Sequence, residues 1–147
     1  QEKFYNLICS YFRDCCLGIV VFDVTNYNSF KQVDYWVAEF EKFSMEEKKK
    51  PIILVGSKID AENLREVSRE EGAEKAVSLG CEYIECSAKS NFNIEDIFEK
   101  TTNLIYSKIQ EGEINPQITR GIKINSQIES FYLYREQPKK DKCCVIL

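Results

Sequence analysis

Apolar residues recur at helical spacing in four stretches of the chain, and each stretch predicts an amphipathic helix. Asn28 is a candidate cap for the second helix. Ser68 and Glu71 form a capping box at the start of the third helix, and Gly80 marks its end. Gly112 lies just beyond the fourth helix. The helices are expected over residues 3–13, 28–40, 68–80 and 94–109.

Three continuous apolar runs separate these helices and predict strands. They read "GIVVFDV" at residues 18–24, "IILVG" after Pro51, and "EYIECSA" at residues 82–88. Continuous β-branched runs are typical of parallel strands that are buried on both faces. Since strands and helices alternate, the chain is expected to form an α/β fold, a parallel sheet of three strands with helices on both faces.

Composition narrows the class of protein. The chain has 147 residues, of which 44% are hydrophobic and 30% charged, values typical of one globular domain. A net charge of -4 argues against a nucleic-acid partner, which requires a basic surface. No apolar run approaches the roughly 18 residues of a membrane-spanning helix.

The cysteines do not form the pattern of a disulfide or zinc framework. There are seven cysteines and no histidine, and no C-x-x-C occurs. Cys15-Cys16 and Cys143-Cys144 are adjacent pairs. We therefore expect free thiols in a reducing cytosol, with Cys15 and Cys16 packed in the core and not acting as redox sensors. The absence of histidine excludes His-dependent catalytic triads.

Polar residues follow each predicted strand. Asp23, the Ser57-Lys58-Asp60 cluster and Ser87-Ala88-Lys89 would meet beyond the carboxyl ends of the strands, where such sheets bind ligands. The alternative for Lys58 and Asp60 is an exposed charge pair where a strand leaves the core.

Two regions are expected: a domain over residues 1–110 and a flexible tail over residues 111–147, where the periodic pattern decays. Apolar residues within the tail either dock on the domain or contact a partner, and the sequence leaves both open. They are Ile122, Ile124, Ile128 and the "FYLY" of residues 131–134.

Four segments together resemble the Rab branch of the Ras-like small GTPases. They are "QEKFYNLICSYFRDCCLGIVVFDVTNYNSF" (1–30), "ILVGSKID" (53–60), "CSAK" (86–89) and "CCVIL" (143–147). The resemblance implies the carboxyl-terminal portion of a P-loop NTPase G domain. It also implies a molecular switch that binds GTP and GDP and regulates intracellular vesicle transport.

The resemblance assigns a role to each residue of the rim. Asp60 would accept the N1–H and the amino group of guanine, and the stem of Lys58 would lie along the base. The backbone N–H of Ala88 would donate to the guanine O6, in a loop shaped by Ser87 and Lys89. Ser57 stands where most relatives have asparagine, so we expect weaker affinity for the base.

The amino end resembles the second switch of the family. Gln1 would orient the attacking water, the role that Ras illustrates for this class. Residues 1–16 would contact exchange factors, GTPase-activating proteins and effectors.

The phosphate-binding motif G-x-x-x-x-G-K-[ST] does not occur in the sequence, and neither does the threonine-bearing first switch. The aspartate-glycine that precedes Gln1 in the family is missing as well, so no magnesium ligand is evident here. We therefore interpret the chain as a fragment that does not hydrolyse GTP alone. We also expect an exposed apolar edge along residues 18–24, because the neighbouring strands of the family are missing.

The carboxyl end resembles a prenylation box. Cys144 to Leu147 fits the motif, and the final leucine favours a geranylgeranyl group. Cys143 is a candidate for a second lipid, and Lys139, Lys140 and Lys142 would be attracted to an anionic membrane. This predicts attachment to the cytosolic face of intracellular membranes, after contact with the prenylation machinery. The alternative is a frayed terminus with two incidental cysteines.

Two other classes of function remain to be weighed. The chain could be a non-enzymatic, prenylated interaction module, such as a decoy for prenylation machinery or partners. A receiver-like α/β signalling domain is disfavoured, because its phosphoacceptor carboxylates are not evident and a prenylation box is foreign to it.

Overall fold

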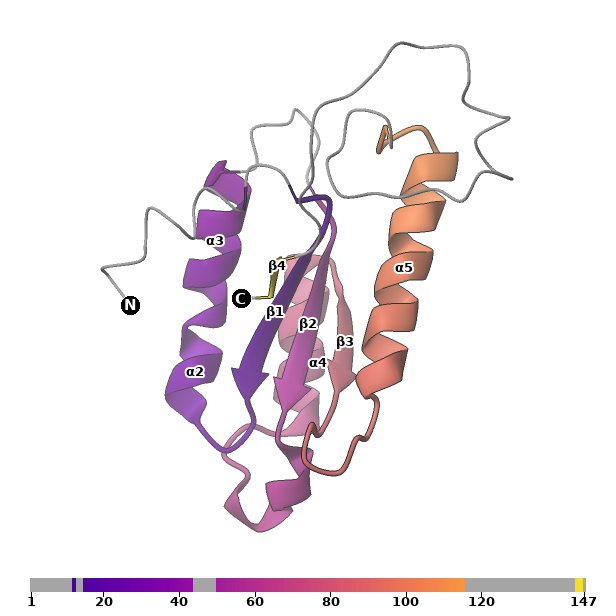
Figure 1. The fold of residues 1–147 in the computed structure, drawn as a ribbon. Helices are drawn as coiled ribbons and strands as arrows, with labels where there is room; N and C mark the ends of the chain where they lie inside the picture. Colours follow the sequence, from indigo (N-terminus) through magenta and orange to yellow (C-terminus); the bar gives the residue numbers. More distant parts are fainter. Residues whose placement is uncertain (1–11, 13–14, 44–49, 116–144, 147) are drawn as a thin grey trace.

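The three predicted strands form one parallel sheet in the computed structural model, which describes residues 12, 15–43, 50–115 and 145–146 (Figure 1). Strands β1 (Gly18–Asp23), β2 (Ile52–Ser57) and β3 (Glu82–Glu85) lie in the order β3-β2-β1. Asp23 lies opposite Ser57 in the register of the first pair. The predicted fold class is thus confirmed, and the carboxyl ends of β1 and β2 meet at one edge.

A short fourth strand, β4 (Val145–Ile146), lies beside β1. It pairs in parallel with Gly18 and Ile19. An edge strand offers unpaired N–H and C=O groups that an extended segment can use. The expectation that the whole β1 edge stands bare is therefore wrong for these two residues. Two residues of the predicted tail also have regular structure.

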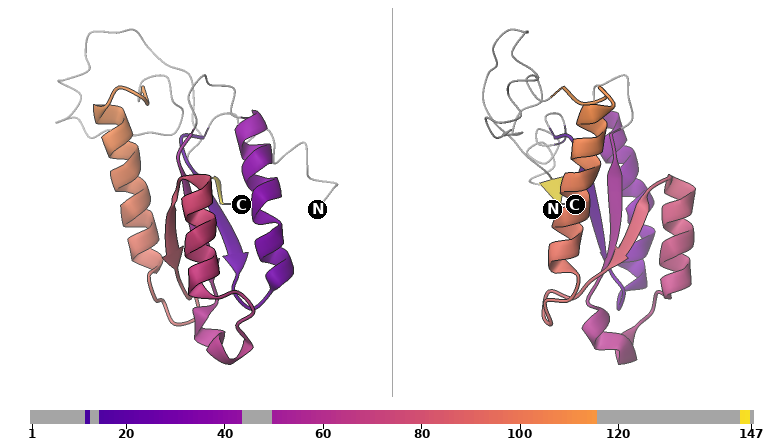
Figure 2. Two further views of the ribbon diagram at one scale, coloured as in Figure 1. Left: turned by 180° about the vertical axis from the view of Figure 1, so that it is seen from behind. Right: turned by 90° about the vertical axis from the view of Figure 1, so that its right-hand side faces the viewer.

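Helices cover both faces of the sheet, as Figure 2 shows when the sheet is viewed along its edge. One face carries α2, α3 and α4, whose apolar residues form a core with Val20, Phe22 and Leu54. The other face carries α5, where Ile97 joins a second core with Ile19 and Val55. The helices are α2 (Tyr27–Lys31), α3 (Val33–Phe43), α4 (Arg69–Leu79) and α5 (Ile94–Gln110), with a 3₁₀ segment η2 (Ile59–Leu64). Side chains alternate between the two cores because successive residues of a strand point to opposite faces.

The second predicted helix differs from expectation. The hydrophobic residues that predict one helix lie on two, α2 and α3, which are separated at Gln32. Asn26, not Asn28, is the cap: its side-chain oxygen accepts hydrogen bonds from the backbone N–H groups of Asn28 and Ser29. The helix therefore begins earlier than the hydrophobic stripe does, because the cap is set by the turn that follows β1.

The predicted ends of α4 are confirmed. Ser68 accepts a hydrogen bond from the backbone N–H of Glu71, and the Glu71 carboxylate accepts one from the backbone N–H of Ser68. Gly80 ends the helix with φ at 68°, a left-handed conformation that glycine adopts without steric penalty.

Cys15 and Cys16 are buried thiols, as the sequence predicts. Apart from Phe12, the expected helix over residues 3–13 lies outside the described residues, and so does most of the tail. Within the described part of the chain, no helix is long and apolar enough to cross a membrane.

Candidate functional site

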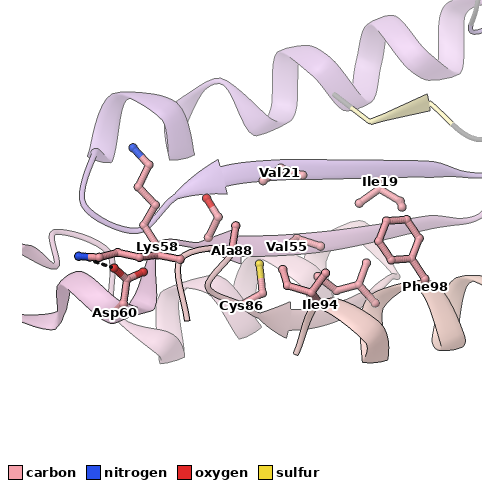
Figure 3. Close-up of a pocket in the computed structure, with 12 residues that line it drawn as sticks. Ile19, Val21, Val55, Lys58, Asp60, Cys86, Ala88, Ile94 and Phe98 are labelled. Carbon is pink, nitrogen blue, oxygen red and sulfur yellow. Dashed lines mark ion pairs between the residues drawn. The ribbon is translucent and has the colours of Figure 1, made fainter. Parts of the chain in front are cut away.

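A pocket of about 570 Å³ runs along β1 and β2 to their carboxyl ends (Figure 3). Its inner walls are apolar side chains of β1, β2 and α5 together with Cys86. The polar residues of the motifs gather at one end of it: Ser57, Lys58, Asp60 and Lys89, with Ala88 beside them. The structure thus brings together five of the six residues predicted to bind nucleotide, and the sixth, Ser87, contacts Asp60.

Ser57 is engaged within the sheet. Its Oγ donates to the carbonyl oxygen of Phe22 at 3.0 Å, and its own carbonyl accepts from the N–H of Val24 at 3.0 Å. The hydroxyl therefore joins the ends of β1 and β2. It has only one hydrogen to donate, so donation to a ligand would break this contact.

Lys58 turns sharply out of β2, with a left-handed φ of 67°. Its Nζ lies 2.5 Å from Oδ2 of Asp23, on the neighbouring strand. Figure 3 shows the side chains of Lys58 and Asp60 diverging from each other. The two motif charges, two residues apart in sequence, are thus not paired with each other.

Asp23 is ionised more readily than an ordinary aspartate. Burial would raise its pKa, but the hydrogen bonds from Lys58 and Thr25 outweigh burial and hold the pKa of Asp23 below its usual value. The Asp23 carboxylate is therefore a fixed negative charge at the edge of the site.

Asp60 lies at the start of η2 and lines the pocket, with its side chain 21% exposed. The buried Ser87 donates its hydroxyl to Oδ1 of Asp60 at 2.5 Å, and Nζ of Lys89 lies 3.8 Å from Oδ2. The Ser87 hydrogen bond, and to a smaller degree the nearby lysines, lower the pKa of Asp60. Asp60 is thus oriented and held as a carboxylate, an acceptor for two neighbouring donors.

The loop after β3 is held by its own hydrogen bonds. Ser87 and Phe92 exchange backbone hydrogen bonds of 3.1 and 3.0 Å, and the N–H of Ser90 donates to Ser87 Oγ at 3.1 Å. The sequence predicts Ser87 and Ala88 within a strand, but β3 ends at Glu85. The pairing ends there because β2 turns away at Lys58. Ala88 is exposed in the loop, and its N–H has no protein acceptor among the described residues.

A second ion-pair cluster links the end of η2 to β3. Nη1 of Arg65, at the end of η2, donates to Oε1 of Glu85 at 2.9 Å, and Tyr83 donates its hydroxyl to the same oxygen at 2.9 Å. Burial and the neighbouring Glu85 raise the pKa of Tyr83, so the hydroxyl remains a donor. The sequence offers no signal for this cluster, because Arg65 and Glu85 are 20 residues apart.

Other predicted functional residues cannot be placed. Gln1, Cys143 and Cys144 lie outside the described residues. Over the described ranges, no group of three His, Cys, Asp or Glu side chains could hold a metal ion.

Comparison with known proteins agrees with this geometry. Residues 1–107 match the family model described as the Ras family. The Ras-related protein Rab-39A of mouse and that of human are each 40% identical to the chain over 114 residues, which is 78% of this chain. The match covers 52% of each relative, so the chain spans about half the length of the curated relatives it matches.

Proposed function

Because the chain belongs to the Ras family, in its Rab branch, we propose that it recognises the base of a guanine nucleotide and is part of a GTP-dependent switch that regulates vesicle transport. The observation that carries the proposal is the Asp60 carboxylate, oriented by the buried Ser87 and facing a pocket beside Lys58 and Ala88.

The chemistry of guanine fits these groups. Guanine presents an N1–H and an amino group side by side, and the two oxygens of Asp60 can accept one hydrogen bond from each. The exposed N–H of Ala88 is the donor for the guanine O6. Adenine offers neither this pair of donors nor this acceptor, and it would leave polar groups of the site unpaired.

The rest of the switch rests on family resemblance. GTP would order residues 1–16, which would recruit effectors, exchange factors and GTPase-activating proteins, and hydrolysis would release them. Gln1 would orient the attacking water once a phosphate-binding half and its Mg²⁺ are present. Geranylgeranyl and second lipid groups on Cys144 and Cys143 would hold the protein on the cytosolic face of intracellular membranes.

The first prediction tests recognition of the base by replacing the carboxylate of Asp60 with an amide. Xanthine carries an oxygen where guanine carries its amino group, and an asparagine offers one donor and one acceptor. In the complete product of the gene, Asp60→Asn should weaken GDP binding by about 100-fold or more and strengthen binding of xanthosine diphosphate. Both dissociation constants are measured by titration with fluorescent nucleotides.

Asp34→Asn is the matched control, because Asp34 is an exposed carboxylate that is paired with Lys75 at 2.8 Å, outside the pocket. It should leave both dissociation constants unchanged. The proposal is wrong if wild-type protein binds no GDP, or if Asp60→Asn weakens both nucleotides equally. The first result would favour the non-enzymatic interaction module.

A further inference from the structure

Two carboxylates and two lysines at the rim pair in a fixed pattern. Lys58 binds Asp23 at 2.5 Å, and Lys89 lies 3.8 Å from Asp60. The ammonium of Lys58 is therefore drawn across to the end of β1, while the carboxylate of Asp60 is left to Ser87 and Lys89. The pairing separates the positive charge of Lys58 from the acceptor that would read guanine.

Asp23 is a rigid anchor for this pairing. Its Oδ1 accepts from the backbone N–H of Thr25 at 2.9 Å and from the Thr25 hydroxyl at 2.7 Å. Its backbone N–H donates to Ser29 Oγ at 2.9 Å, which ties the end of β1 to α2. Its side chain is only 19% exposed. One carboxylate oxygen is thus fixed by the turn, and Oδ2 faces Lys58.

Lys58, by contrast, has little else to hold it. Its side chain is 63% exposed, and a free lysine stem samples many rotamers. With its ammonium bound to Asp23, the stem is held in one direction beside the mouth of the pocket, which it lines. A flat base that enters the pocket would contact an apolar stem that is already ordered. Binding would therefore not incur the entropic cost of ordering that side chain.

We propose that Asp23 is the positioning residue for Lys58: it holds the lysine stem as a preformed wall for the guanine base and keeps the ammonium away from Asp60. The inference rests on the proposed function and deepens it, because it adds a residue to which the motifs give no role. Asp23 is not required merely to join β1 and β2, since Ser57 Oγ and the N–H of Val24 already do so.

The second prediction is a double-mutant cycle on the complete gene product, with GDP affinity as the measured quantity. Asp23→Asn keeps an oxygen for Thr25 but turns an amide N–H₂ toward Lys58, so the ammonium loses its partner. We expect GDP affinity to fall about threefold to tenfold. Lys58→Met should cost a similar factor. In the Lys58→Met background, Asp23→Asn should change the affinity by less than about twofold, because there is no ammonium left to position.

Two further variants separate positioning from folding. Asp23→Glu keeps the charge and should restore most of the affinity that Asp23→Asn loses. Asp34→Asn removes an ion pair of the same kind outside the pocket and should leave affinity unchanged. Thermal unfolding of the nucleotide-free proteins should show similar midpoints for Asp23→Asn and Asp34→Asn.

The outcomes distinguish the two proposals. If wild-type protein binds no GDP, the proposed function fails and this inference fails with it. If wild-type protein binds GDP but Asp23→Asn has the same effect with and without Lys58, Asp23 has only a structural role and the positioning inference alone is overturned. Failure of Asp23→Glu to restore affinity would also overturn it.

Discussion

At the scale of single residues, the geometry of the site depends on which hydrogen-bond donor is paired with each acceptor. Ser87 is fully buried and donates its hydroxyl hydrogen to Asp60, while Ser57 donates its one hydroxyl hydrogen to the Phe22 carbonyl. Both hydrogen bonds stabilise the fold, but only the bond from Ser87 orients a residue that would contact the base. The family resemblance predicts that Ser57 gives weaker affinity than asparagine would, and the hydrogen bond from Ser57 to Phe22 would be one cause of such a loss.

The third prediction follows from Ser57. In Ser57→Asn an amide replaces the hydroxyl and offers two hydrogens, so one can remain on Phe22 while the other reaches a ligand. We expect GDP to bind about threefold to tenfold more tightly, the range of one additional hydrogen bond. The measurement is the dissociation constant for fluorescent GDP of the complete gene product.

Ser57→Ala is the companion variant, because it removes the Phe22 contact and adds no donor. It should not tighten binding. Equal affinities of the Ser57→Asn and wild-type proteins would show that residue 57 does not limit recognition of the base.

At the scale of elements, local sequence fixes the helix ends where a complete capping signal is present. The box at the start of α4 is formed as the sequence predicts. The start of α2 is different, because Asn26 and Asn28 are both acceptable caps and the turn after β1 selects the first. The length of β3 likewise depends on a neighbour that is distant in sequence, because its pairing with β2 ends where Glu85 lies opposite Gly56.

The fourth prediction concerns the capping box of α4. Ser68→Ala leaves the N–H of Glu71 without its acceptor, and we expect the free energy of unfolding to fall by about 1 kcal/mol. Urea denaturation of the chain measures this change. Ser78→Ala, near the other end of the helix, removes an exposed hydroxyl that donates to the carbonyl of Lys75 and should have a much smaller effect. Equal losses would show that the box does not stabilise the helix.

At the scale of the whole molecule, the described sheet presents the edge that we propose recognises the base of a guanine nucleotide. Its three main strands end at motifs that suit guanine, and the sequence holds no phosphate-binding loop. β4 pairs with the first two residues of β1. Phosphoryl transfer depends on positioning and charge around the phosphates, so recognition of the base does not by itself give catalysis.

The fifth prediction is therefore made for the 147-residue chain by itself. We expect no measurable turnover of GTP, with or without added Mg²⁺, because no phosphate-binding motif is present to stabilise the transition state. Release of inorganic phosphate over several hours measures it. Turnover that depends on magnesium would contradict our account of which parts hydrolysis requires.

The sequence by itself determined the order of strands and helices, the parallel sheet, the capping box of α4 and the placing of Asp23, Lys58 and Asp60 at one edge. These follow from local periodicity, from local hydrogen bonds and from the rule that parallel strands end together. Only the tertiary structure decided that Lys58 binds Asp23 and not Asp60, and that Ser87 orients Asp60. These two contacts join residues that are 35 and 27 positions apart in the sequence. They depend on the register of the strands and on the turn at Lys58, which no local pattern encodes.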